Sequence, residues 1–454
     1  CKMACEFQVS ELEMALTIQI HIDGQWRDAA QVGFTANQGG INSGAWLSYE
    51  TDYWAEHASV DALEGPVTDH RAVSVQFPVD LTYHTLDRWP SFLLDLLPQG
   101  PVRSRIAREQ RLRPDDPKLD SLLLSIASST PVGNTRIRQA WEREQRNIHQ
   151  LQCPSLTDAD VLSGSSKLTD VLDTYVKRAP GATCVQGEWP KVLLTRSKRD
   201  GFLYPDPYLG TQDGAEHFIA KLAKTGRHTD ELILASEAPY LEMARVVGLN
   251  CGAPLKYGKG ILIIPRFDRF ASSEQVLLHG QESLYSAMGV TEFGARRSHE
   301  DYLAVIDQCS DDPVADRIEY LKRDVLNIAA GNPDNHGRNT ALCRYAAGGT
   351  RLSPMFDFAP MRLSDAGIAR ATRWRCLGSS DPGGDWSTVC EAVACDGLSS
   401  NDVRDILLGM LPQLFGMRDI AGQLGVASEV IKQVIFVEGM ASVIEALKKV
   451  NSQT

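Results

Sequence analysis

The period of the hydrophobic residues changes along this chain, and the change restricts the possible folds more than any other feature. Leu16–Ile22 alternates apolar and polar residues, which is typical of a strand, and Ala72–Phe77 is a second short candidate. Helical spacing follows in four segments, Trp89–Leu97, Val102–Gln110, Leu119–Ser128 and Thr135–Leu151. The beginning of the chain is therefore predicted to be β-rich, with helices after it.

A second β-rich section follows a Pro/Ser/Thr stretch near Cys153–Thr157. Its candidate strands are Lys191–Ser197, His217–Leu222 and Gly260–Pro265. Between the last two we expect a helix that Thr229 or Asp230 caps and Gly248 ends. From about residue 275 helical spacing predominates, so the order predicts a two-lobed α+β protein. We expect an N-terminal β-rich subdomain with helices over 1–152, a second β-rich unit over 153–270 and a helical unit over 271–454.

Composition narrows the functional classes. The 454 residues include 46 Lys and Arg against 58 Asp and Glu, a net charge of −12. Such a surface repels a phosphate backbone, so any DNA contact is expected to be indirect or local. No apolar run approaches the ~20 residues of a membrane helix, and the ten cysteines form no C-x-x-C pair. These features predict a cytoplasmic protein without membrane attachment.

The chemistry is concentrated in two segments. Residues 332–339 read NPDNHGRN, a polar loop that brings Asp334, His336 and Asn339 together, and Asp357 follows among apolar neighbours. Asp-x4-Asn followed by Asp-Phe is the layout of a phosphoryl-transfer site, in which one Asp accepts a proton while Asn and the second Asp hold Mg²⁺. The alternative is a purely structural role, a polar turn with a buried capping carboxylate.

A phosphoryl-transfer site also requires a lysine on a strand upstream. Lys221 lies in the apolar strand His217–Leu222, and burial there demands a counter-charge. Glu237 on the following helix can supply it, with Glu231 and Glu242 as competitors.

Several motifs, in this order, resemble those of the HipA-type serine/threonine kinases, the toxins of bacterial toxin–antitoxin pairs. Residues 89–100 are similar to F-x-x-L-L-P-E-G, and residues 187–191 (GEWPK) resemble the phosphate-loop segment G-x-x-P-K. Lys221 matches the family's lysine that contacts the nucleotide, and Glu237 matches the glutamate of the helix that follows it. Residues 266–269 match R-F-D-R, 332–339 match N-x-D-x-H-x-x-N, and 353–357 contain P-x-x-D.

The resemblance implies a protein-kinase-like fold and an ATP- and Mg²⁺-dependent kinase of serine or threonine. Asp334 would be the catalytic base, with His336 bracing the loop and Arg338 keeping a cation near the transferred phosphoryl group. Asn339 and Asp357 would bind the metal. The nucleotide contacts implied by the motifs are Gly187, Lys191, Lys221, Glu237, Arg266, Phe267 and Asp268.

The phosphate loop departs from the family pattern. Cys184, beside Thr183, stands where the best-known members carry a serine that is autophosphorylated, and Gln186, Glu188 and Trp189 are bulky where the family tends to small residues. Self-inhibition is therefore expected to be absent or moved to Thr183. An acid such as Glu188 close to the phosphates is expected to weaken nucleotide binding unless its side chain points away.

The same resemblance implies a small DNA-binding antitoxin of the HipB type as partner, and an aminoacyl-tRNA synthetase as the kind of protein substrate. Two other interpretations stay open. The Asp/His/Asn cluster can bind a divalent ion and hydrolyse DNA, as in metal-dependent nucleases. Alternatively, a weak phosphate loop leaves a pseudokinase that acts as a scaffold for the antitoxin.

Overall fold

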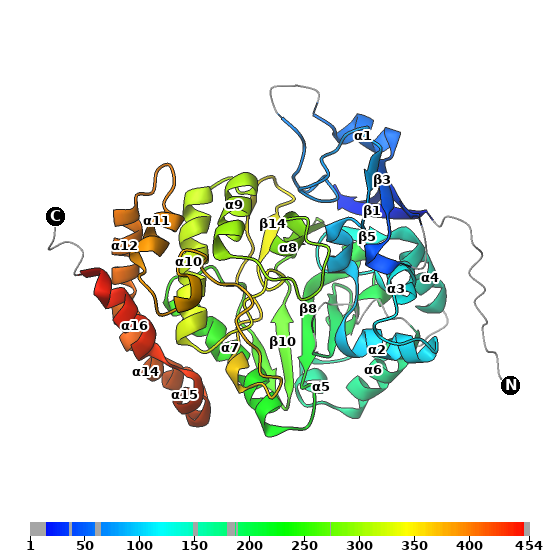
Figure 1. Cartoon of the computed structure of the whole chain (residues 1–454). Helices are drawn as coiled ribbons and strands as arrows, with labels where there is room; N and C mark the ends of the chain where they lie inside the picture. The colour runs from blue at the N-terminus through cyan, green and yellow to red at the C-terminus, as the bar shows by residue number, and fades with distance from the viewer. Residues whose placement is uncertain are drawn as a thin grey trace.

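The computed structural model describes residues 15–35, 39–59, 65–148, 153–178, 187, 189–272 and 274–448. In Figure 1 the blue and cyan N-terminal part lies beside a green sheet, and yellow to red helices lie on the other side of that sheet. Buried apolar side chains form separate clusters in these parts. The architecture confirms the predicted α+β class, with a β-rich N-terminal part and a mainly helical C-terminal part.

The N-terminal part is built on a five-stranded antiparallel sheet with the order β4-β3-β2-β1-β5. β1 has the bounds predicted from the alternation, and it is buried along its whole length because it pairs with β2 and β5 and contacts α4 and β12. The elements are β1 (Leu16–Ile22), β2 (Gln25–Phe34), β3 (Ala45–Tyr49), α1 (Thr51–His57), β4 (His84–Leu86), η2 (Ser91–Leu96), α2 (Gly100–Glu109), α3 (Lys118–Ala127), β5 (Thr135–Ile137) and α4 (Arg138–Ile148).

One prediction in this part was wrong, and two predicted helices differ in type or in their first residue. Ala72–Phe77 is a turn with one bridge between Ser74 and Phe77. Glu282 on β13 (Gly280–Ser283) accepts from the Ser74 hydroxyl and from the backbone N–H of Val75. The segment after Pro90 forms the 3-10 helix η2. Residues 135–137 pair with β1, so the predicted helix at 135–151 begins only at Arg138.

The central sheet has the order β7-β6-β8-β10-β9, and all of its pairs are antiparallel. The three predicted strands are present in it. The helix α7 begins one residue before Thr229 and has no side-chain cap, so the predicted capping was wrong. Gly248 ends the helix with φ +83°, as expected. The elements are α5 (Asp158–Leu162), α6 (Ser166–Arg178), β6 (Lys191–Ser197), β7 (Leu203–Pro205), β8 (Gly214–Leu222), α7 (His228–Val246), β9 (Lys256–Gly258) and β10 (Ile261–Pro265).

The C-terminal part surrounds a small sheet, β13-β14-β15, with helices. Its elements are β11 (Arg269–Ala271), β12 (Val276–Leu278), β13 (Gly280–Ser283), α8 (Leu284–Ala287), α9 (His299–Cys309), α10 (Pro313–Ala329), β14 (Ala341–Arg344), β15 (Thr350–Leu352), α11 (Ser387–Val393), α12 (Ser400–Gly409), α13 (Leu411–Phe415), α14 (Met417–Gln423), α15 (Ser428–Val434) and α16 (Val437–Ala446). Within the described ranges, no helix combines the length and apolarity that crossing a bilayer requires.

Candidate active site

The hairpin of β14 and β15 brings the two polar segments together. Residues 331–340 lead into β14, and residues 353–357 leave β15, which is antiparallel to it. The end of one segment and the beginning of the other therefore lie at the same end of the hairpin. Gly331, with φ +70°, makes the exit from α10 possible, because a Cβ there would lie 2.4 Å from the carbonyl oxygen of Val434.

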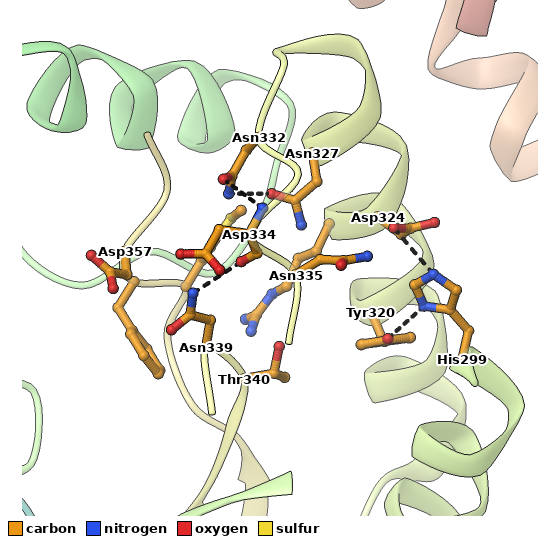
Figure 2. A pocket seen from close by; sticks show the side chains of 13 residues that line it. His299, Tyr320, Asp324, Asn327, Asn332, Asp334, Asn335, Asn339, Thr340 and Asp357 are labelled. Atoms are coloured by element: carbon orange, nitrogen blue, oxygen red, sulfur yellow. Dashed lines mark hydrogen bonds and ion pairs between the residues drawn. The ribbon is translucent and has the colours of Figure 1, made fainter. Parts of the chain in front are cut away.

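Asp334 lies in a loop held by its own polar residues. Its backbone N–H donates to Asn332 Oδ1 (3.3 Å), and its carbonyl accepts from Asn339 Nδ2 (2.9 Å). His336 Nε2 lies 3.4 Å from Asp334 Oδ1. Figure 2 shows Asp334, Asn339 and Asp357 next to one another in a shared pocket. The loop thus presents a carboxylate and an amide oxygen from adjacent positions.

Asp357 adopts a left-handed backbone with φ +54°, an uncommon conformation for a residue other than glycine. Such strain is found most often at functional sites, where the surrounding structure enforces it. Its Oδ1 lies 2.5 Å from Lys221 Nζ. Burial would raise the pKa of Asp357, but Lys221 and Lys191 outweigh burial and hold that pKa well below its usual range.

Lys221 on β8 is buried between two carboxylates. Its Nζ lies 2.7 Å from Glu237 Oε2 on α7, in addition to the contact with Asp357. Burial would lower the pKa of this lysine, but Asp357 and Glu237 outweigh burial and raise it above the ordinary value. Of the three candidate glutamates, the structure therefore pairs Glu237 with Lys221.

Lys191 joins the same cluster from the neighbouring strand. It stands directly opposite Lys221 in the β6–β8 register, so both side chains leave the same face of the sheet. Burial lowers the pKa of Lys191, against the attraction of Asp357. Gly187, with φ +111°, passes so close that a Cβ there would lie 2.6 Å from Lys191 Nζ. Thr183, Cys184, Gln186 and Glu188 lie outside the described residues.

The R-F-D-R element lies in a buried network of ion pairs. Arg266 and Asp268 pair with each other at 2.7 Å, and Arg266 also pairs with Asp206 at 3.1 Å, with all three side chains buried. Asp268 further accepts from the N–H of Gly133 in the N-terminal part (2.8 Å). Arg266 and Asp268 therefore join two parts of the chain, and their contact with a nucleotide stays a prediction.

Phe267 lies apart from that network. Its ring centroid is 6.0 Å from that of Phe356, the neighbour of Asp357. Phe356 lines the pocket, so Phe267 lies next to one of the pocket residues.

Arg338 connects the loop to the N-terminal part. Its guanidinium pairs with Asp95 of η2 at 2.6 Å and lies over the ring of Phe293. Ser283 donates to both oxygens of the same Asp95. Arg338 thus anchors the loop, and its role toward the transferred phosphoryl group stays a prediction.

Sequence reasoning missed Asn335, which fastens the loop to the segment after Asp357. Its Oδ1 accepts from the backbone N–H groups of Ala371 and Thr372, and its Nδ2 donates to the carbonyl of Thr372 (2.9 Å). Nothing in the local pattern distinguishes Asn335 from the other loop asparagines, because its partners are 36 and 37 residues away.

Beneath the loop, His299, Tyr320 and Asp324 line the inner wall of the same pocket (Figure 2). His299 lies 2.7 Å from the hydroxyl of Tyr320 and 3.5 Å from Asp324. Burial lowers the pKa of His299 to about 4. These residues were not predicted either, since a helical histidine is usually a core residue.

The donor set fits Mg²⁺ and phosphate groups. Because Asn339 Nδ2 is engaged with a carbonyl, its Oδ1 remains for a cation, and Asp357 Oδ2 has no hydrogen bond among the described residues. Mg²⁺ prefers such hard oxygen ligands and keeps several waters. No group of three His, Cys, Asp or Glu side chains suited to a metal occurs in the described part of the chain, so an ion would depend on these two ligands. Lys191 and Lys221 supply cations for phosphates.

Comparison with known proteins places the chain in a family. Residues 183–413, half of the chain, match the HipA-like C-terminal domain. This chain belongs to the HipA family. Y4mE of Sinorhizobium fredii, whose name describes it as a candidate kinase, is 27% identical over 133 residues. That match covers 27% of this HipA-family chain and 31% of Y4mE.

The fold extends beyond the matched domain. HipA of Shewanella oneidensis MR-1, solved in a complex with HipB and its operator DNA, superimposes with a TM-score of 0.61 at 15% identity. The superposition covers 97% of this chain and all of that one. The HipA-type fold predicted from the motifs is therefore confirmed for nearly the whole chain.

Proposed function

We propose that this HipA-family chain is an ATP- and Mg²⁺-dependent serine/threonine protein kinase that acts as a toxin. One observation carries the proposal. Lys221, Glu237 and Asp357, which come from a strand, a helix and a loop far apart in sequence, converge within 2.7 Å at the pocket that Asp334 and Asn339 line. Kinases use such a lysine–glutamate pair beside an Asp carboxylate and an Asn amide that bind Mg²⁺.

Each residue then has a defined task. Lys191 and Lys221 hold the phosphates of ATP, and Asn339 and Asp357 hold Mg²⁺, which neutralises the charge on those phosphates. Asp334 accepts the proton of the attacking hydroxyl, whose oxygen bonds to the γ-phosphorus as the bond to ADP breaks. His336 keeps the Asp334 carboxylate in position, and Asn335 fixes the loop.

A role for Phe267 follows from its place beside Phe356. Phe356 lines the pocket with Asp357, and the aromatic surface that it forms with Phe267 suits the adenine base. We expect the substrate to be a protein with an exposed serine or threonine, for which an aminoacyl-tRNA synthetase is the first candidate.

The partner we propose is a HipB-like DNA-binding antitoxin. The support is the fold shared with a HipA that was solved together with HipB and its operator DNA. With a net charge of −12, the chain itself is expected to reach DNA through that partner or through a local patch.

The decisive experiment incubates the purified chain with Mg²⁺, ATP labelled at the γ-phosphate and a bacterial lysate. Asp334→Ala should abolish labelling but retain ATP binding, since Asp334 acts on the hydroxyl and not on the nucleotide. Asp365→Ala is the matched control, because its carboxylate is exposed and its ion pair among the described residues is with Arg227 at the surface. Acid hydrolysis of the labelled band identifies phosphoserine or phosphothreonine.

Equal labelling by Asp334→Ala would contradict the assignment of the base. If the folded parent transfers no phosphate, loss of plasmid DNA without ATP would indicate the nuclease. Complex formation with the antitoxin alone would indicate the scaffold.

A further inference from the structure

A second pocket lies between the N-terminal sheet and the central sheet, away from the candidate active site. Residues on both sides line it, among them Trp26 and Arg136 from the N-terminal part and Arg269 from the far side. None of these residues has a role in the proposed phosphoryl transfer. The pocket therefore requires an explanation of its own.

Arg136 on β5 is the central group of this pocket. Its guanidinium carbon lies 4.0 Å from the ring centre of Trp26 and 4.2 Å from that of Trp141, so two indoles enclose it. Arg136 is only 5% exposed. Its Nε donates to Gln19 Oε1 at 2.8 Å, and its terminal nitrogens have no hydrogen bond to any described residue.

Arg136 has no ion pair with any described residue. Asp28, the nearest acid acting on it, is engaged by Arg138 and Gln19. Asp206 and Asp268 are taken up by the R-F-D-R network. A fourth nearby acid, Glu142, pairs with Arg138, so no carboxylate of this network lies within ion-pair distance of Arg136. A buried cation without a paired anion costs free energy.

Thr130 provides a second, independent indication. Its hydroxyl lines the same pocket, is buried, and has no hydrogen-bond partner among the described residues. Buried hydroxyls are normally satisfied. A ligand with acceptor oxygens would satisfy both Thr130 and the terminal nitrogens of Arg136.

We propose that this pocket binds a small oxyanion, held by Arg136 with the hydroxyl of Thr130 and the positive field of Arg269. Guanidinium groups pair with the oxygens of phosphate and of carboxylate alike. Because Arg136 belongs to the N-terminal sheet and Arg269 to β11, an anion between them strengthens the contact of the two parts. Its occupancy is thus expected to stabilise the whole chain.

Calorimetric titration of the full chain with inorganic phosphate, and separately with acetate at equal ionic strength, tests the site and separates the two sources of oxyanion. Arg136→Gln should weaken binding of the preferred anion at least about tenfold, as expected for a charged hydrogen bond. Thr130→Val should weaken it several-fold and fold normally, since its hydroxyl has no partner to lose. Arg113→Gln removes the same charge from a position whose side chain is 80% exposed and should change nothing.

The proposal fails if neither anion binds at millimolar concentration, or if Arg136→Gln and Thr130→Val bind like the parent. Binding that these variants do not alter would place the anion elsewhere, for instance between Lys191 and Lys221. If Arg136→Gln does not fold, Thr130→Val decides the question. Neither result depends on kinase activity. The test of the anion site is therefore independent of the proposed function.

Discussion

Lys221 remains charged inside the protein because two carboxylates surround it. A lysine among apolar strand residues needs such partners, and for that reason its pairing with Glu237 could be predicted from the sequence. The position of Arg338 could not be predicted in the same way. Its partner Asp95 lies 243 residues away, and no local pattern connects the two. Pairings within one strand and the next helix can be inferred from the sequence, whereas those between distant parts require the fold.

Replacing Lys221 tests whether its charge is needed for binding ATP. Lys221→Met should raise the KM for ATP at least about tenfold and lower turnover, because the phosphates lose a charged hydrogen bond. Steady-state kinetics over a range of ATP concentrations measure both effects. Lys224→Met, at an exposed position three residues later, should behave like the parent. Unchanged ATP dependence in Lys221→Met would remove the strand lysine from the mechanism.

At the scale of elements, the hairpin of β14 and β15 explains why the two polar segments form one site. Both could be identified in the sequence, because polar residues that compete with regular structure are conspicuous between apolar ones. The attachment of the loop to residues 371–372 could not, since it depends on backbone groups that carry no sequence signal.

This attachment can be removed by one substitution. Asn335→Ala leaves the backbone groups of residues 371 and 372 without their buried partner and should cost about 2 kcal/mol of unfolding free energy. Turnover should fall further than ATP affinity, because the loop carries Asp334. Urea denaturation and kinase kinetics measure the two effects. Asn401→Ala, at an exposed position of α12, serves as the control.

At the scale of the whole molecule, buried charges join residues 131–133 of the N-terminal part to residues 266–269. Arg266 and Arg269 both reach carbonyls in residues 131–133, and Asp268 accepts a backbone N–H there. The motif R-F-D-R was recognised in the sequence, but its buried contacts with residues 131–133 were not predicted. A short motif identifies a family without showing which way its side chains point.

The pH dependence of stability follows from this network. Burial would raise the pKa of Asp268, but Arg266 and Arg269 outweigh burial and hold it well below the usual range. A depressed carboxyl pKa stabilises the folded state above the unfolded value, about 3.9, and this stabilisation is lost as the pH falls. Asp268→Asn should therefore cost about 3–5 kcal/mol at pH 7, with the difference from the parent shrinking below about pH 4.

Urea denaturation of both proteins across this pH range provides the measurement. Asp365→Asn, which breaks a surface pair instead, should differ little from the parent at any pH. A constant difference between Asp268→Asn and the parent at all pH values would contradict the role given to the Asp268 charge.

The alignment of Lys191 with Lys221 has a consequence for how this chain can change in length. The β6–β8 ladder is regular from that pair to Arg196, and its one bulge lies between Arg196 and Ser197, at the opposite end. An inserted or deleted residue before the bulge would turn one lysine to the other face of the sheet. Beyond the bulge, the turn at 198–202 joins β6 to β7 outside their paired residues, so its length can change without turning either lysine. Length variation among relatives is therefore expected at this turn and excluded near the lysines.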